Sequence, residues 1–289
     1  MDYSNGGMGD KTVLITGGTS GIGKAAALAL AAMGANVFVV GRNRERGEAA
    51  VEEISARSHN ESVELLLADL SVQSEVRGFA QEFQERHDRI DVLVNNAGLV
   101  QSKRTETPDG IETTLAINHL APFLLTNLLL DRLKGSAPSR VITVSSEAQR
   151  WGTVDFDDLQ SRRKYRGFPV YGMTKLANIM FTYELAERLN GTGVSATCLH
   201  PGSVGTNFGQ NNRGPMALFF RTFKPLMRSP ERGADTLVWL ASSPEVEGVS
   251  GKYFFDRKEI EAKKVAYDPA ARRRLWEISE ELTGLKVAA

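Results

Sequence analysis

The chain has 289 residues, which is enough for one large domain or two small ones with a sizeable core. Its 35 lysines and arginines balance 35 acidic residues, so charge gives no reason to expect nucleic acid or an anionic membrane as a partner. The single cysteine, Cys198, excludes an internal disulfide and suits a reducing compartment, and its apolar surroundings in sequence predict a buried, inert thiol.

The chain begins with ten polar, Gly-rich residues that lack the basic-then-apolar pattern of a signal peptide. No stretch reaches the roughly 18 apolar residues that a membrane helix needs, so we expect a cytoplasmic protein. A short buried strand at residues 12–15 is followed by a Gly-rich turn at 16–23 and an Ala-rich helix at 24–33. This order predicts a phosphate site, because glycines let the backbone approach a pyrophosphate and the helix start offers unpaired N–H groups.

The Gly-rich turn reads T-G-x-x-x-G-x-G, which differs from the general G-x-G-x-x-G fingerprint. Its spacing resembles that of the short-chain dehydrogenase/reductase family. The resemblance implies that the turn binds a nicotinamide dinucleotide. The residues it assigns to that contact are Gly17, Thr19, Ser20, Gly21, Ile22 and Gly23.

The second strand, residues 37–40, ends at Gly41 and Arg42. A carboxylate at this strand end binds the ribose 2′-hydroxyl of NAD, whereas an arginine accommodates the 2′-phosphate of NADP. Because no acid stands here, we expect NADP(H) rather than NAD(H), with Arg42 as the contact. Alternatively, Arg42, Arg44 and Arg46 form a solvated helix start. Some NADP-dependent members of the family carry a base in the Gly-rich turn, where this chain has Ser20.

Two further strand ends carry family motifs. The strand at 63–68 ends in Asp69 and Leu70; the resemblance implies that Asp69 accepts a hydrogen bond from the adenine amino group, although it could equally cap the helix expected at 74–86. The next buried strand, from residue 91, ends in N-N-A-G. The family reading of this motif implies cofactor contacts at Asn95, Ala97 and Gly98.

A long helix is expected at about 111–133, with Asn118 and His119 in its interior. The resemblance implies that Asn118 supports a water-mediated proton relay, while the alternative is a satisfied core amide. Nothing in the sequence pairs with His119, so we expect a packing histidine. The strand at 140–144 ends in Ser145 and Ser146, and the resemblance makes Ser146 the hydroxyl that holds a substrate carbonyl.

Tyr171 and Lys175 stand four residues apart in a helix expected at about 171–189, so their side chains share one face. An ammonium beside a phenol favours the phenolate and is expected to bring the phenol pKa toward neutrality. The resemblance adds that both residues also contact the cofactor. It completes a catalytic tetrad, and no metal is required. The tetrad comprises Asn118, Ser146, Tyr171 and Lys175.

Tyr171 follows Ser146 by 25 residues, about twice the separation in compact members of the family. The longer form resembles the retinol-dehydrogenase-like branch, which implies a lipophilic carbonyl or alcohol as substrate; the alternative is an ordinary solvated insertion. The candidate substrate contacts are Gln149, Trp151, Phe168, Met216 and Phe219.

After the sixth strand, a P-G motif resembles the segment that passes the nicotinamide. It implies cofactor contacts at Pro201, Gly202, Val204 and Thr206. The apolar and basic stretch within 207–228 is expected to be a substrate lid, although it could also touch a membrane surface or form a core helix. The apolar richness of the helix from Tyr171 suits either a homodimer interface or a buried helix of a monomer.

Strands alternate with helices of crossover length, which predicts a single doubly wound (Rossmann) α/β domain over residues 1–289, with a parallel sheet covered by helices on both faces. The leading hypothesis is an NADP(H)-dependent oxidoreductase that transfers a hydride between nicotinamide and a carbonyl or alcohol, with Tyr171 as acid and base. The alternative is a non-catalytic dinucleotide-binding scaffold or redox sensor.

Overall fold

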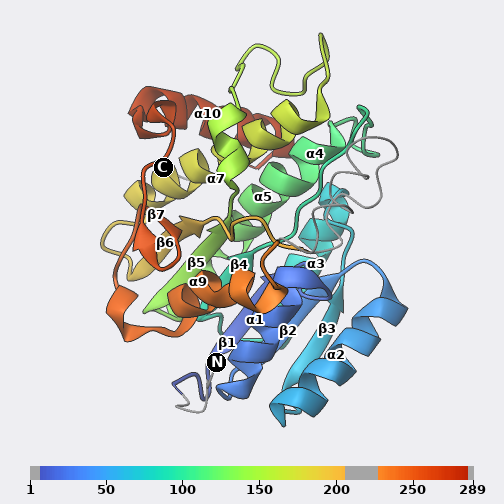
Figure 1. Ribbon diagram of the computed structural model, residues 1–289, viewed down its shortest axis with the longest axis vertical. Helices are drawn as coiled ribbons and strands as arrows, with labels where there is room; N and C mark the ends of the chain where they lie inside the picture. Colours follow the sequence, from blue (N-terminus) through green and yellow to red (C-terminus); the bar gives the residue numbers. More distant parts are fainter. Residues whose placement is uncertain (1–6, 206–226, 286–289) are drawn as a thin grey trace.

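One sheet runs through the computed structural model, which describes residues 7–205 and 227–285 (Figure 1). Its strand order is β3-β2-β1-β4-β5-β6-β7-β8, and all neighbours are parallel except β7 and β8. The strands are β1 Thr12–Thr16, β2 Asn36–Gly41, β3 Val63–Leu67, β4 Val92–Asn95, β5 Ser139–Val144, β6 Val194–Leu199, β7 Lys252–Phe255 and β8 Lys258–Glu259.

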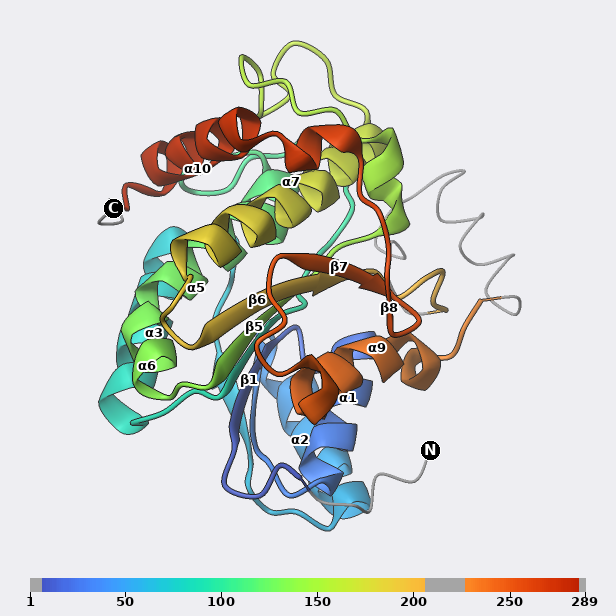
Figure 2. The ribbon, with the colours of Figure 1, turned by 90° about the vertical axis from the view of Figure 1, so that its left-hand side faces the viewer.

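Helices cover both faces of this sheet, as expected for a doubly wound domain (Figure 2). The α-helices are α1 Gly21–Ala32, α2 Arg44–Ser58, α3 Gln73–Arg86, α4 Thr113–Leu115, α5 Ala121–Leu128, α6 Leu130–Gly135, α7 Gly167–Arg188, α9 Pro230–Ser242 and α10 Pro269–Thr283. A π-helix, η1 Ala116–Leu120, joins α4 to α5, and 3-10 helices are η2 Glu147–Trp151, η4 Pro244–Val246 and η5 Lys264–Tyr267.

The core is divided by the sheet because successive strand residues point to opposite faces. Val13 and Ile15 of β1 pack in a cluster with residues of α1 and α9, whereas Leu14 packs in a second cluster with residues of α3, α5 and α7. These strand residues are completely buried. Figure 2 shows α1 and α9 on one side of the sheet and α3, α5 and α7 on the other. The predicted fold class is confirmed.

The helix expected at 111–133 is not one continuous α-helix. It is divided into α4, η1, α5 and α6, and the amide of Ala121 donates to the carbonyl of Ala116 five residues back. Pro122 has no N–H group and cannot continue the α-helical ladder, which accounts for a local π-turn. The expected helix from Tyr171 also begins four residues earlier, at Gly167.

The parallel strands place several loops at one edge of the sheet. The loops after β1, β4, β5 and β6 carry the Gly-rich turn, N-N-A-G, Ser146 and the P-G motif. The chain order reverses between β1 and β4, the point at which doubly wound sheets bind their ligands. Within the two described ranges, every helix is too short or too polar to cross a bilayer.

Candidate active site

Ser146 and Tyr171 meet where the end of β5 approaches the first turns of α7. Their side chains share a hydrogen bond, and Ser146 Oγ also accepts from the amide of Ala148 at 3.2 Å. Lys175 Nζ lies 5.7 Å from the centroid of the Tyr171 ring. Both side chains of this pair are buried, so the structure brings the phenol, the ammonium and the serine hydroxyl together as the sequence predicted.

Burial dominates the ionisation of the tyrosine–lysine pair. It raises the pKa of Tyr171 to about 12, against the opposing effect of the hydrogen bond from Ser146. It lowers the pKa of Lys175 to about 8, because the charged ammonium is the form that desolvation penalises. The lowered phenol pKa expected from the Tyr171–Lys175 spacing is therefore wrong for this structure, and Tyr171 is a protonated acid at neutral pH.

Lys175 is held from the sheet side of α7. Its Nζ donates to the carbonyl of Val144, the last residue of β5, at 2.9 Å. Ser145 Oγ donates to the backbone carbonyl of Lys175 at 2.7 Å. Gly98 lies directly opposite: a Cβ there would stand 3.3 Å from Lys175 Nζ and from Asn118 Oδ1. The glycine of N-N-A-G thus leaves room for the lysine.

Asn118 is completely buried in the π-helix η1. Its Oδ1 accepts from the amide of Leu99 at 2.8 Å, while Nδ2 donates to the carbonyl of Leu99 at 2.9 Å and to Thr174 Oγ1 at 3.0 Å. Both amide hydrogens are therefore engaged. The side chain joins the segment after β4 to α7, immediately before Lys175.

Two glycines set the approach of the Ser146 segment to α7. A Cβ on Gly172 would lie 2.5 Å from the carbonyl oxygen of Ala148, and one on Gly152 would lie 2.3 Å from that of Gly172. Contacts this short do not occur for real Cβ atoms, so larger residues would force the two backbones apart. Gly172 follows Tyr171 directly, and this packing determines how closely Ser146 and Tyr171 approach.

The Gly-rich turn has the features of a phosphate cradle. Gly17 adopts φ +66°, a left-handed conformation that favours glycine. A Cβ on Gly23 would stand 2.4 Å from the carbonyl oxygen of Gly17. Ser20, at the start of α1, makes no side-chain cap, and the first turn contains no acidic residue. The α1 start therefore keeps the N–H groups and positive dipole end that suit a pyrophosphate.

Asn96 holds this turn in place, and sequence reasoning missed it. Its Nδ2 donates to the carbonyls of Thr16 at 2.8 Å and Gly17 at 3.2 Å, and its amide donates to Thr16 Oγ1. The signal was its position within N-N-A-G. By contrast, the predicted cofactor residue Asn95 buries its side chain against α5, where it donates to Thr126 Oγ1 at 2.9 Å. The backbone amide of Ala97, the next residue of the motif, also donates to Thr16 Oγ1.

The end of β2 lies beside the Gly-rich turn and leads into Arg42. A Cβ at Gly41 would meet Thr19 Cγ2 at 2.7 Å, so a larger residue there would require the Thr19 side chain to shift. The side chain of Arg42 is 64% exposed, and its nearest acidic group is Asp69, with Nη1 4.0 Å from Oδ2. Asp69 Oδ1 accepts from the amide of Ser71, so it does not cap α3, which begins at Gln73. Leu70 adjoins Asp69 and is half-buried.

The P-G motif lies at the edge of the described residues. Gly202 adopts φ +76°, a conformation that glycine favours, and Val204 pairs with Arg228 in an isolated parallel bridge. Pro201 precedes them and is half-buried. Among the other predicted contacts, Thr206, Met216 and Phe219 lie outside the described residues, as does the expected lid apart from residues 227 and 228.

Two of the predicted substrate residues form an aromatic series with Tyr171. Ring centroids of Trp151 and Phe168 are 5.8 Å apart, and those of Phe168 and Tyr171 are 6.4 Å apart. Trp151 is 61% exposed and Phe168 is 42% exposed. Gln149 differs from them, because it is buried and its Oε1 accepts from the amide of Lys263 at 3.1 Å. Its position indicates a structural contact to the C-terminal segment.

His119 is a buried packing residue, as the sequence suggested. Its Nδ1 lies 3.3 Å from Asn178 Oδ1, and its Nε2 lies 3.0 Å from Ser279 Oγ of α10. Burial lowers its pKa to about 4, against a weaker opposing effect of Asn178. The ring is therefore neutral across the physiological range.

Acidification is expected to destabilise the protein through His119. Its folded pKa of about 4 lies below the unfolded value, so the unfolded chain binds more protons between about pH 4 and 6.5. Stability is therefore present above about pH 6.5 and declines as the pH falls, by about 3 kcal/mol from this group alone. Urea unfolding at several pH values should show a shallower decline in His119→Gln. The exposed His59, exchanged for Asn, should retain the wild-type decline.

No cluster of metal-ligating side chains occurs within residues 7–205 and 227–285. Cys198 is buried, and burial raises the pKa of its thiol well above the ordinary value. The phenol, the ammonium and the serine hydroxyl that meet in the described site are groups suited to proton transfer.

Comparisons with known proteins agree with this geometry. A family model described as short chain dehydrogenase matches residues 11–216. Retinol dehydrogenase 14 of Homo sapiens is 45% identical over 294 residues, covering 96% of this chain and 88% of that protein. The crystal structure of an uncharacterized protein from Mycobacterium paratuberculosis is similar at TM-score 0.80 and 31% identity, covering 100% and 99% of the two chains. A short chain dehydrogenase from Burkholderia cenocepacia in complex with NADP has TM-score 0.69 and 26% identity, covering 86% and 97%.

Proposed function

The chain belongs to the short-chain dehydrogenase family, and we propose that it is an NADP(H)-dependent oxidoreductase that interconverts a carbonyl and an alcohol. The observation that carries the proposal is the hydrogen bond between half-buried Ser146 and buried Tyr171, with Lys175 beside the phenol and a phosphate cradle at the same edge of the sheet. A protonated phenol and an ammonium at such a site are suited to general acid–base catalysis.

NADP(H) would be held by the Gly-rich turn, the start of α1 and Arg42. The close approach of Gly23 to Gly17 and the absence of a cap at Ser20 support a pyrophosphate at the turn. The contact between Gly41 and Thr19 disfavours the acid that NAD would require, and Arg42 supplies charge for a 2′-phosphate. When bound, the nicotinamide supplies or accepts the hydride.

Each member of the tetrad has a separate task in this proposal. Ser146 orients the substrate oxygen by hydrogen bonding, and Tyr171 donates its phenolic proton to that oxygen in the reducing direction and removes it in the oxidising direction. Lys175, protonated below about pH 8, favours the phenolate that forms on Tyr171. Asn118 binds the backbone of Leu99 and so fixes the segment at Gly98 and Leu99 that lies opposite Lys175.

The proposed substrate is a lipophilic aldehyde, ketone or alcohol. Trp151 and Phe168 expose aromatic surface beside Tyr171, and such rings contribute apolar contact area to a ligand. The relative named retinol dehydrogenase 14 acts, by its name, on a lipophilic alcohol. We further propose a cytoplasmic protein of one domain, with residues 207–228 as substrate lid. Residues 170–185 of α7 are buried within the single chain, which favours the buried-helix alternative over a homodimer formed through α7.

A panel of apolar and polar carbonyl compounds with NADPH tests the function. Consumption of NADPH, followed by absorbance at the nicotinamide band, is expected with the apolar members. NADPH binding without oxidation by any compound would instead favour a non-catalytic scaffold or redox sensor. Size-exclusion chromatography with light scattering tests the dimer.

Arg42→Asp is expected to reverse the cofactor preference. The substitution removes a cation and places a carboxylate where the 2′-phosphate of NADP would lie, so the ratio of kcat/KM for NADPH over NADH should fall by about 100-fold, or about 2.7 kcal/mol. Steady-state kinetics with both cofactors measures the ratio. Arg44→Asp, at the first residue of α2, serves as the matched control and should shift this ratio far less. An unchanged ratio in Arg42→Asp would contradict the assignment.

A further inference from the structure

The three residues that follow N-N-A-G, 99–101, each contact a tetrad residue or the start of α7. The backbone of Leu99 is paired with the side chain of Asn118 in both directions. Val100 is buried in a small cluster with Tyr171 and Ala148. The carbonyl of Gln101 accepts a hydrogen bond from the Tyr165 hydroxyl at 3.2 Å. The position of this short segment therefore affects both Asn118 and Tyr171.

Glu112 fixes the start of the helical run that carries Asn118. It is completely buried, and its two carboxylate oxygens accept from the amides of Thr114 at 2.8 Å and Leu115 at 2.7 Å. A carboxylate in this place caps the helix and suits the positive end of its dipole. Asn118 follows six residues later, within the same run.

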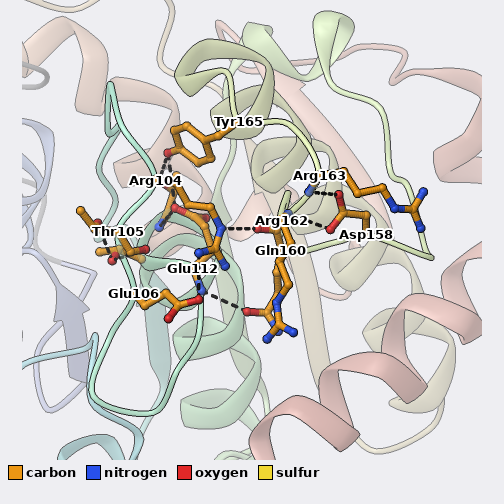
Figure 3. A network of polar contacts seen from close by, with 11 residues as sticks. Arg104, Thr105, Glu106, Glu112, Asp158, Gln160, Arg162, Arg163 and Tyr165 are labelled. Carbon is orange, nitrogen blue, oxygen red and sulfur yellow. Dashed lines mark hydrogen bonds and ion pairs between the residues drawn. The ribbon is translucent and has the colours of Figure 1, made fainter.

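Tyr165 lies just before α7 and precedes Tyr171 by six residues, the same separation as that between Glu112 and Asn118. Its hydroxyl lies 3.3 Å from Glu112 Oε1 and 3.2 Å from Thr114 Oγ1, in addition to its bond to Gln101. Burial raises the pKa of Tyr165 to about 12, so the hydroxyl remains a donor at physiological pH. Figure 3 shows this side chain pointing toward Glu112.

Packing at the first residue of α7 reinforces the contact. A Cβ on Gly167 would lie 2.2 Å from the carbonyl oxygen of Gln101, so the start of α7 rests directly on the segment after β4. Around it, Arg104 Nε donates to the carbonyl of Gln160 at 3.1 Å, and the amide of Glu112 donates to Gln160 Oε1 at 3.3 Å (Figure 3). The segment between Ser146 and Tyr171 is thus anchored to the loop before α4.

We propose that Tyr165 and Glu112 are positioning residues that align the helix carrying Asn118 with the helix carrying Tyr171 and Lys175. They touch neither substrate nor cofactor; they act through Gln101 and the helix starts. The inference rests on the proposed oxidoreductase function. It also gives the long segment between Ser146 and Tyr171 a role beyond substrate contact, since that segment supplies Tyr165.

Tyr165→Phe is expected to lower kcat by about tenfold, because small misplacements of reacting groups are costly even when their origin is remote. KM for the carbonyl and Kd for NADPH should stay within about twofold, since the binding surfaces are untouched. Tyr267→Phe is the matched control: Tyr267 is partly exposed, and its hydroxyl accepts from the amide of Ala262. That control should lose a hydrogen bond without a change in kcat.

Glu112→Gln leaves one acceptor oxygen for two amides, so its kcat should fall at least as far as that of Tyr165→Phe. The double variant should resemble the more impaired single variant, because both substitutions disturb the same alignment of the two helix starts. Losses that multiply, or an unchanged kcat in Tyr165→Phe, would overturn the proposal. The proposal would also be overturned if the fall in kcat/KM of Tyr165→Phe came entirely from a rise in KM, with kcat unchanged.

Amide hydrogen exchange tests the alignment without relying on turnover. In Tyr165→Phe, amide exchange should be about tenfold faster than in wild type at residues 99–101, 113–118 and 167–171. The exchange rates of β1 and α1 should be the same in both proteins. Unchanged exchange in all three segments would refute the positioning role. A wild-type protein that binds NADPH but reduces no carbonyl would refute the oxidoreductase function instead, and the exchange result would still decide the role of Tyr165 and Glu112.

Discussion

Tyr171→Phe is expected to reduce turnover by about 1,000-fold or more while NADPH continues to bind. The substitution removes only the phenolic oxygen, which is the group that shares a hydrogen bond with Ser146. General acid–base groups typically contribute about 100- to 10,000-fold to rate. The ammonium of Lys175 lies 5.7 Å from the centroid of the Tyr171 ring, so it does not occupy the position of the phenolic oxygen. The Gly-rich turn is untouched, so NADPH affinity should change little. Stopped-flow reduction of the best carbonyl, with fluorescence titration of NADPH, measures both quantities.

Tyr183→Phe provides the control for this substitution. Tyr183 lies on the same helix and is also buried, but it follows Tyr171 by 12 residues and contacts Tyr267 rather than the tetrad. It should retain near-normal turnover. Near-normal turnover in Tyr171→Phe would reject Tyr171 as the acid.

Sequence patterns were sufficient for the fold because each strand and helix carries its own local signal. β1 places Val13 and Ile15 on one face and Leu14 on the other, and the glycine at Gly34 follows α1. Patterns of this kind need no tertiary information. The π-turn at η1 was not foreseen, because its cause is a single proline inside an otherwise helical pattern.

The candidate site was predictable only where chemistry is written into short motifs. Tyr171, Lys175 and Ser146 meet as their spacing and motif context suggested. The roles of Asn96 and Tyr165 were not predictable, since each depends on a partner distant in sequence: Asn96 contacts the turn after β1, and Tyr165 contacts Gln101. Burial also had to be seen before the phenol pKa could be assigned, because burial raises it against the opposing hydrogen bond from Ser146.

The pH dependence of carbonyl reduction should report the protonation of Lys175. Burial lowers its pKa to about 8, whereas Tyr171 has a pKa of about 12 and remains protonated throughout the assay range. The rate should therefore be nearly constant from about pH 6 to 7.5 and fall above about pH 8, as the lysine loses the charge that favours the phenolate. Lys175→Met should lower kcat by about 100-fold or more and remove this decline.

Stability measurements distinguish loss of the ammonium from unfolding. The folded pKa of Lys175 lies below its unfolded value of 10.5, so the unfolded chain binds more protons between about pH 8 and 10.5. The contribution of Lys175 to stability therefore increases as the pH rises through about 8, while its contribution to catalysis decreases. Lys175→Met, compared with wild type by urea unfolding at pH 7 and 9, should be relatively more stable at pH 7. The exposed Lys252→Met should alter neither profile. If wild-type activity and stability instead fell together above pH 8, the loss of rate would reflect unfolding, and the assignment of Lys175 would be wrong.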